Sequence, residues 1–272
     1  MDDNRKKRIG ELVTNAQAVT DQVERSRKYK NIAGLICQEA VRSNDMLYLE
    51  EAKKIAALVT DDPSKAYVEI VRAIAKLPRK DKTAFDEAVK ITERIDNDLD
   101  LSVALHEISV AFGKFGIDKD DKALYSDCLE MIQKIPLDTY RSMALRNISK
   151  ALSGKNHVDS LGLLEKSIGI IEKSTGIHTI YLVYAFCETA ALLAILNDER
   201  SYGFLKKAMA MADNIIDDFE RSAVFLKILE THIDMGTKLK DEKLLDESAL
   251  ILKQITKEYY KTLAKNALKN IS

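Results

Sequence analysis

The sequence predicts an all-α protein, a solenoid of about seven two-helix repeats. Its 272 residues include only 3 prolines and 10 glycines and no tryptophan. This composition favours helices, and no segment has the apolar–polar alternation between turn residues that predicts strands. In addition, one phrase recurs along the chain, for example as ERSRKYKNIAGLI from Glu24 and as YRSMALRNISKAL from Tyr140.

One residue at the centre of each phrase, aliphatic in all repeats but one, serves as the anchor of its repeat. In chain order the anchors are Ile32, Ile70, Ile108, Ile148, Thr189, Ile228 and Leu268. The steps between them are 38, 38, 40, 41, 39 and 40 residues. A period of about 39 to 40 residues fits one helical hairpin per repeat, so we predict stacked hairpins that wind into a right-handed superhelix.

Positions counted from the anchor carry the same kind of residue in most repeats. Six residues before it stand Ser26, Ser64, Ser102, Ser142, Ser222 and Thr262. Four residues before it stand Ala66, Ala104, Ala144, Ala185 and Ala264, and the next position is mostly a large apolar residue. Because i and i+4 share a helix face, we expect the alanines to let a facing helix approach. We expect the serines to touch the neighbouring repeat.

The chain is predicted to form a single helical-repeat domain over residues 1–272. Each repeat has a more polar first helix and a more buried second helix. The predicted repeats lie near 6–42, 46–77, 82–114, 120–153, 158–196, 199–236 and 242–271. We expect Asp98, Asp138 and Asp218 to be N-caps of second helices, and Gly116 and Gly236 to end such helices.

These features resemble the tetratricopeptide-like and HEAT-like helical-repeat proteins, and the resemblance covers essentially the whole chain. The small residue four positions before the anchor and the large one after it echo the tetratricopeptide alternation. The tryptophan and Leu-Gly positions of that motif are absent, and the period here is longer. The resemblance implies a scaffold or a peptide-binding surface.

Charge and hydropathy argue against two other classes of partner. The 42 Lys and Arg residues nearly balance the 43 Asp and Glu residues, so we expect neither nucleic acid nor an anionic membrane as a partner. The most apolar run, 180–196, is 17 residues long and contains Glu188. It is too short for a membrane span, and we predict none.

No catalytic or metal-binding motif stands out. The sequence has no phosphate-binding glycine loop and no nucleophile motif, and its four histidines have no paired-ligand spacing. Asp96, Asp98, Asp100 and Glu107 match EF-hand ligand positions, but Leu101 replaces the glycine that the loop requires. We therefore predict no metal, no cofactor and no enzymatic activity.

The three cysteines are widely spaced on predicted helices and lack any paired motif. They are Cys37, Cys128 and Cys187. We interpret them as reduced thiols and predict a cytoplasmic protein.

The residue directly before the anchor is polar in most repeats. Together with the residues at positions −5, −2 and +2, counted from the anchor, it forms one face of each second helix. We predict that this face binds a peptide or helix of another protein. The candidate residues are His106, Glu107, Arg146, Asn147, Tyr184, Glu188, Leu226 and Lys227. A carboxylate in an apolar run needs a partner, and Lys227, one repeat after Glu188, is the predicted one.

Three alternatives remain open from the sequence. First, the predicted binding face is only a solvated surface. Second, a pocket near Tyr184, Glu188 and Lys227 holds a small ligand or forms an active site. Third, the apolar residues of the last repeat, Leu263, Leu268 and Ile271, lack a cap, so this end of the chain packs on an earlier element or forms a homodimer.

Overall fold

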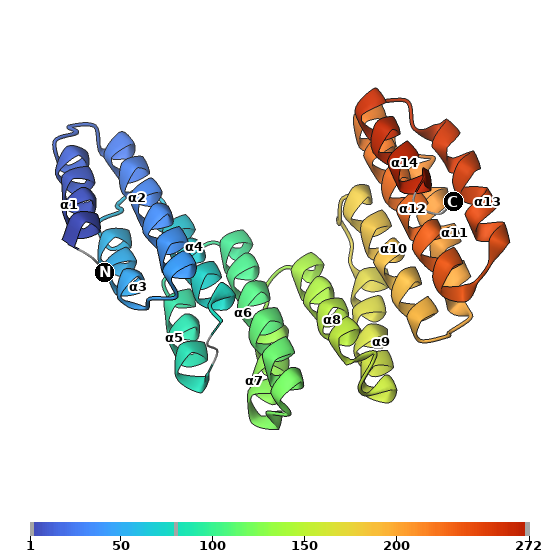
Figure 1. Cartoon of the computed structure of the whole chain (residues 1–272), viewed down its shortest axis with the longest axis horizontal. Helices are drawn as coiled ribbons and strands as arrows, with labels where there is room; N and C mark the ends of the chain where they lie inside the picture. Colours follow the sequence, from blue (N-terminus) through green and yellow to red (C-terminus); the bar gives the residue numbers. More distant parts are fainter. Residues whose placement is uncertain (1–2, 79–80, 270–272) are drawn as a thin grey trace. The chain divides into compact units, whose positions relative to one another are not determined.

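The structure, a computed structural model, describes residues 3–78 and 81–269 (Figure 1). Within these residues it contains fourteen α-helices, one short 3₁₀ helix and no β-strand. The helices pack in adjacent pairs, as the repeat predicts. The chain is therefore an all-α helical-repeat solenoid, and the predicted fold class is confirmed.

Every predicted repeat contains one first helix and one second helix. The first helices are α1 (Asp3–Gln17), α3 (Leu47–Ala56), α5 (Lys82–Thr92), α7 (Lys122–Gln133), α9 (His157–Lys173), α11 (Arg200–Ala212) and α13 (Glu242–Ile251). The second helices are α2 (Gln22–Ser43), α4 (Ser64–Lys76), α6 (Asp98–Lys119), α8 (Asp138–Leu152), α10 (Thr179–Ile195), α12 (Asp218–Leu239) and α14 (Glu258–Lys269). The 3₁₀ helix η1 (Leu252–Gln254) continues α13.

The chain divides into two compact units, Met1–Ala144 and Leu145–Ser272, with the boundary inside α8. In the N-terminal unit α2 packs on α4 and α4 on α6, while α3, α5 and α7 pack on the second helices that precede them. In the C-terminal unit α10 packs on α12 and α12 on α14, with α11 and α13 beside them. In each unit, consecutive second helices therefore pack on one another.

The alanine column and every anchor except the half-buried Leu268 lie in the core of their unit. Ile70, Ile108 and Ile228 are fully buried, and so are Ala104 and Ala264. Burial of the anchor together with the residue four positions earlier confirms that this helix face packs inward.

The serine column joins consecutive repeats through hydrogen bonds. Oγ of Ser26 accepts from the backbone N–H groups of Thr60 at 3.2 Å and Asp61 at 3.1 Å, in the turn before α4. Ser102 accepts in the same way from Leu137, and Ser222 from Thr256 and Lys257. Each hydroxyl therefore satisfies turn N–H groups of the next repeat, which confirms the predicted contact.

The predicted N-caps were wrong by one residue. The capping side chains of α2, α6 and α12 are Asp21, Asn97 and Asp217, each of which accepts a hydrogen bond from a first-turn N–H. Asp98, Asp138 and Asp218 are instead the first residues of their helices. An acidic side chain in the first turn still interacts favourably with the helix dipole.

Gly116 and Gly236 do not end their helices, contrary to expectation. Both lie inside a helix, four residues before the left-handed C-caps Asp120 and Lys240, whose φ values are 54° and 55°. A Cβ on Gly116 would lie 3.1 Å from the backbone oxygen of Asp121 and 3.1 Å from the backbone nitrogen of Tyr125. This glycine therefore lets α7 approach α6 closely.

Candidate functional site

A hollow of about 740 Å³ runs across α2, α4 and α6 in the N-terminal unit. We call it the N-terminal groove. Its lining residues are Arg27, Lys30, Asn31, Gly34, Leu35, Gln38, Lys65, Val68, Glu69, Arg72, Asp100 and Val103. All of them belong to second helices.

The groove uses the helix face that the repeat pattern singles out. Counted from their anchors, the lining residues at positions −5, −2, −1 and +2 are Arg27, Lys30, Asn31 and Gly34 on α2, and Lys65, Val68, Glu69 and Arg72 on α4. In these repeats the predicted face therefore lines a hollow. The candidate residues predicted from the sequence lie in later repeats, although the same columns mark α2 and α4.

A smaller hollow of about 240 Å³ adjoins the groove between α2 and α4. The two hollows share Gln38, Glu69 and Arg72, and the smaller one continues as far as Arg42 and Lys76. Together they extend along α2 from Arg27 to Arg42, a rise of about 22 Å for a helix.

Charged side chains on α4 and α6 form a small network at the groove. Nη1 of Arg72 donates a hydrogen bond to Oε1 of Glu69 at 2.8 Å, and its Nε lies 3.5 Å from Oε1 of Glu107. Partial burial lowers the pKa of Arg72, but the two carboxylates more than offset this and raise it overall. Glu107, a predicted candidate, is thus held in an ion pair at the groove.

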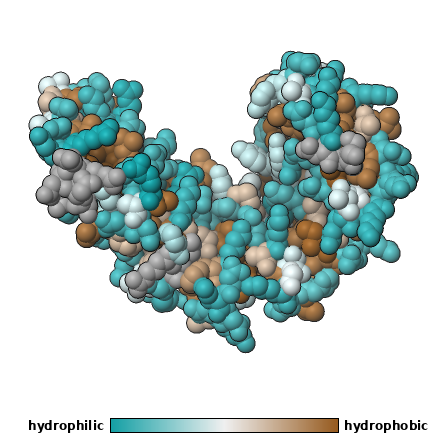
Figure 2. All heavy atoms as spheres, viewed as in Figure 1, coloured by the Kyte–Doolittle hydropathy of each residue, from teal (hydrophilic) through white to brown (hydrophobic). Residues whose placement is uncertain are grey.

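Apolar side chains lie between these charges. Leu35 is 52% exposed, Val68 is buried and Val103 is half-buried. On the face that Figure 2 shows, hydrophilic side chains predominate, with separate apolar patches between them. An apolar strip bordered by charges is the usual character of a surface that holds a peptide or a helix.

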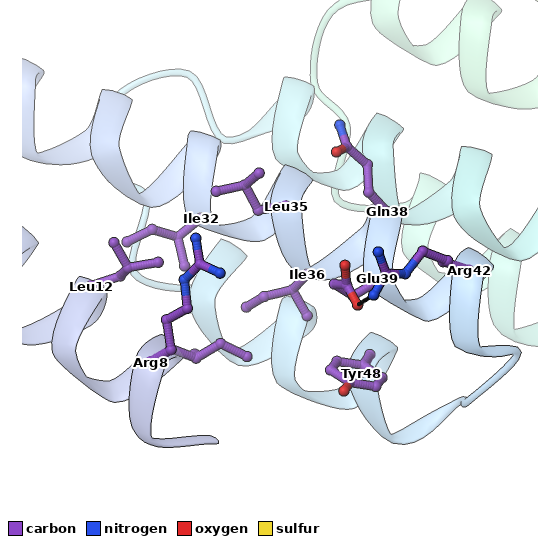
Figure 3. A pocket seen from close by; sticks show the side chains of 10 residues that line it. Arg8, Leu12, Ile32, Leu35, Ile36, Gln38, Glu39, Arg42 and Tyr48 are labelled. Carbon is purple, nitrogen blue, oxygen red and sulfur yellow. Dashed lines mark ion pairs between the residues drawn. The ribbon is translucent and has the colours of Figure 1, made fainter. Parts of the chain in front are cut away.

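A third hollow of about 430 Å³ lies where α1, α2 and α3 meet (Figure 3). Leu12, Ile32 and Ile36 form its apolar side, and Glu39 pairs with Arg42 at 3.5 Å. It shares Leu35 and Gln38 with the N-terminal groove, so the two hollows adjoin on α2.

In the C-terminal unit the structure joins two predicted candidates directly. The Arg146 side chain is 8% exposed, its Nε donates to Oε2 of Glu188 at 3.0 Å, and its Nη1 donates to Oγ of Ser167 at 3.2 Å. Burial lowers the pKa of Arg146, and Glu188 opposes that shift. The predicted partner of Glu188 was wrong: among the described residues Glu188 pairs with Arg146, one repeat earlier, and not with Lys227.

The remaining candidates lie on the same columns without converging on one point. Tyr184, Asn147 and Lys227 are half-buried, and Leu226 is buried in the core. Burial raises the pKa of Tyr184. His106, in the N-terminal unit, forms an edge-on ring contact with Tyr140 at 6.1 Å between centroids.

A separate hollow of about 510 Å³ in the C-terminal unit lies between α11, α12 and α13. The residues that line it are Tyr202, Leu205, Lys206, Met209, Asp213, Phe225, His232, Leu244, Glu247, Leu250, Ile251 and Gln254. Sequence reasoning missed this site because most of its lining comes from first helices, which the pattern predicted to be the more polar ones.

The described residues contain no cluster of three His, Cys, Asp or Glu side chains able to hold a metal ion. In the segment that resembles an EF-hand loop, Leu101 and Glu107 lie within α6. The three cysteines are buried and unpaired, and burial raises the pKa of each thiol to about 12. Within 3–78 and 81–269 no helix combines the length and hydropathy needed to cross a membrane.

The sequence matches no protein-family model and none of the curated proteins with which it was compared.

Proposed function

We propose that this protein is a non-catalytic interaction scaffold whose N-terminal groove binds a segment of another protein. One observation carries the proposal: position −5 of three consecutive second helices, at Arg27 on α2, Lys65 on α4 and Val103 on α6, lines one continuous hollow, and α2 and α4 share three further lining columns. Helical-repeat proteins bind partners along such repeated surfaces, because each repeat adds the same contact positions.

The dimensions of the groove limit the segment that it holds. Together with the smaller hollow beside it, the groove extends about 22 Å along α2, which accommodates about 15 residues of helix or about 7 residues of extended chain. Arg27 and Lys65 have side chains that are 71% and 69% exposed, and they border the apolar Leu35 and Val68. The partner segment is therefore expected to combine apolar anchors with acidic residues.

A reducing compartment suits this proposal. Cys37, Cys128 and Cys187 are unpaired thiols, and such thiols persist where glutathione and thioredoxin keep them reduced. We accordingly propose the cytoplasm as the location. A thiol-trapping assay on cells of the native host, performed before lysis, tests whether the three cysteines are reduced there.

The test of the groove begins with selection of binding peptides from a displayed library against the whole chain. The best peptide is then measured against Leu35→Asp, which places a charge on the exposed apolar strip. Affinity is expected to fall about ten-fold or more, because a central apolar contact is replaced by a desolvated charge. A double variant, Arg27→Glu with Lys65→Glu, is expected to weaken acidic peptides in particular.

Leu47→Asp is the matched control, since Leu47 is exposed but lies at the start of α3, outside the groove. Selected peptides that bind Leu35→Asp and the double variant as tightly as the wild type would refute a binding role for the groove. Circular dichroism confirms that each variant keeps its helices.

Self-association through the last repeat stays a second prediction. On α14, Tyr259 and Leu263 expose apolar surface, whereas Ile271 lies outside the described residues. Light scattering over a concentration series measures the oligomeric state. A strictly monomeric protein would eliminate the dimer without affecting the groove proposal.

The alternative of a ligand pocket near Tyr184, Glu188 and Lys227 has less support. Glu188 is engaged by Arg146, and the neighbouring candidate in the sequence, Leu226 before Lys227, is buried in the core. The hollow between α11, α12 and α13 does not include any of these residues.

A further inference from the structure

The hollow between α11, α12 and α13 contains a buried histidine. His232 comes from α12, and its side chain is 2% exposed. Much of the lining around it is apolar, including Leu205, Met209, Phe225 and Ile251. A polar ring in such surroundings needs hydrogen-bond partners, because water reaches it only through the hollow itself.

One ring nitrogen of His232 has a partner and the other does not. Nδ1 lies 2.9 Å from the backbone oxygen of Ile228. A carbonyl oxygen can only accept, so Nδ1 carries the proton of the neutral ring, and Nε2 is left as an acceptor. Among the described residues, no hydrogen bond to Nε2 is formed.

A second acceptor lies opposite. Oε2 of Glu247, on α13, is 3.9 Å from Nε2 of His232. Two acceptors cannot bond to each other, and 3.9 Å is longer than a hydrogen bond. A single donor placed between them could serve both atoms. The other carboxylate oxygen, Oε1, lies 3.9 Å from Nζ of the exposed Lys243, so the charge of Glu247 is partly balanced.

The rest of the lining favours a neutral occupant. Lys206 on α11 and Asp213 directly after α11 contribute opposite charges, and Tyr202 and Phe225 line the same hollow. A volume of about 510 Å³ lies within the range typical of small-molecule sites. Mostly apolar walls with a few placed polar groups are also typical of such sites.

We propose that this hollow is a binding site for a small, flat, apolar molecule with one N–H or O–H donor, of the indole or phenol type. The donor lies between Nε2 of His232 and Oε2 of Glu247, and the ring lies among the apolar side chains. This site is separate from the N-terminal groove and does not depend on the proposed scaffold function.

The experiment compares indole with 1-methylindole, which has nearly the same shape but no donor. The whole chain is labelled with ¹⁵N-histidine, and both compounds are titrated while the ring nitrogen signals are recorded. Indole is expected to shift the Nε2 signal of His232, and 1-methylindole to bind about ten-fold or more weakly, because it leaves the Nε2 acceptor unpaired.

The variant His232→Leu should bind the two compounds with similar affinity, because the acceptor that distinguishes them is gone. His178→Leu is the matched control, since His178 is exposed at the start of α10, outside this hollow, and should keep the preference for indole. If His232→Leu does not fold, the wild-type titration still decides. Equal affinities, no binding of either compound, or binding that leaves the His232 signals unchanged would each overturn the proposal.

Discussion

Nε of Arg146 donates a hydrogen bond to Oε2 of Glu188 at 3.0 Å, and this pair joins α8 to α10 in adjacent repeats. Only 8% of the Arg146 side chain is exposed, whereas 42% of the Glu188 side chain is exposed. The arginine therefore bears most of the cost of burial, and the glutamate keeps contact with water. Such a pair stabilises the fold mainly by leaving no buried charge uncompensated.

Removing the carboxylate should be costly for this reason. Glu188→Ala is expected to lower the free energy of unfolding by about 1 to 3 kcal/mol, since the buried guanidinium loses its countercharge. Glu188→Gln keeps an acceptor for Nε and should lose less. Urea denaturation of the whole chain measures both values.

Glu230→Ala is the matched control for this prediction, because Glu230 is exposed on α12. Its effect should stay within about 0.5 kcal/mol. If Glu188→Ala were as harmless as Glu230→Ala, the pair would not contribute to stability.

Thr189 occupies an anchor position that is isoleucine or leucine in the other repeats, and it is fully buried. The described residues offer its Oγ1 no hydrogen-bond partner. Thr189→Val replaces this hydroxyl by a methyl group of similar size, so we expect a gain of about 1 kcal/mol in the free energy of unfolding. Thermal and urea denaturation both report it.

A second buried threonine provides the comparison. Oγ1 of Thr231 donates to the backbone oxygen of Lys227 at 2.8 Å, so Thr231→Val should lose stability rather than gain it. Opposite signs for the two substitutions support the assignment. If both substitutions lower the free energy of unfolding, Oγ1 of Thr189 has a hydrogen-bond partner.

The serine bonds between repeats can be tested in the C-terminal unit. Oγ of Ser222 accepts from the N–H groups of Thr256 and Lys257, both at 3.2 Å. Ser222→Ala leaves these two donors unpaired and is expected to lower the free energy of unfolding by about 1 to 3 kcal/mol. Amide exchange at Thr256 and Lys257 should accelerate.

Ser248→Ala is the matched control for Ser222→Ala, since both serines are buried. Oγ of Ser248 donates to the backbone oxygen of Leu244, a helix carbonyl, at 2.9 Å. That carbonyl lies inside α13, where it can keep a helical N–H partner, so the loss should be smaller. Equal losses for the two variants would argue against a special role for the bonds between repeats.

The sequence predicted the repeats and the inward helix face because both depend on residues at fixed spacing. The N-caps were missed by one residue because capping residue types stand at both candidate positions, as in Asn97–Asp98 and Asp217–Asp218. The partner of Glu188 was missed for a different reason. Arg146 stands two residues before its anchor, on the predicted binding face, and only the packing of α8 against Ser167 of α9 shows that it is buried.

The candidate site was only partly predictable. Columns before the anchor indicate a helix face, but whether neighbouring copies of that face enclose a hollow depends on how closely the helices approach. Gly116 illustrates this limit. From the sequence, a glycine at this position predicts the end of a helix, but in the structure the absence of a side chain lets α7 pack closely on α6. The hollow that contains His232 depends equally on such tertiary approach.

His232 should also make stability depend on pH. Burial lowers the pKa of its ring below the ordinary 6.5, although the bond to Ile228 and the charge of Glu247 oppose the shift. The unfolded chain therefore takes up the proton at a higher pH than the folded chain does. The free energy of unfolding is highest above 6.5 and decreases as the pH falls from there towards the folded-state pKa.

In His232→Gln this contribution disappears, so we expect the free energy of unfolding to change less between about pH 7 and pH 5 than in the wild type. The comparison uses slopes, because the substitution alters absolute stability as well. Lys206 on α11, Asp213 directly after it and Glu247 on α13 line the same hollow and remain unchanged in the variant. His178→Gln, at an exposed position, should keep the wild-type slope. Identical slopes for the wild type and His232→Gln would show that the ring titrates as it does in the unfolded chain.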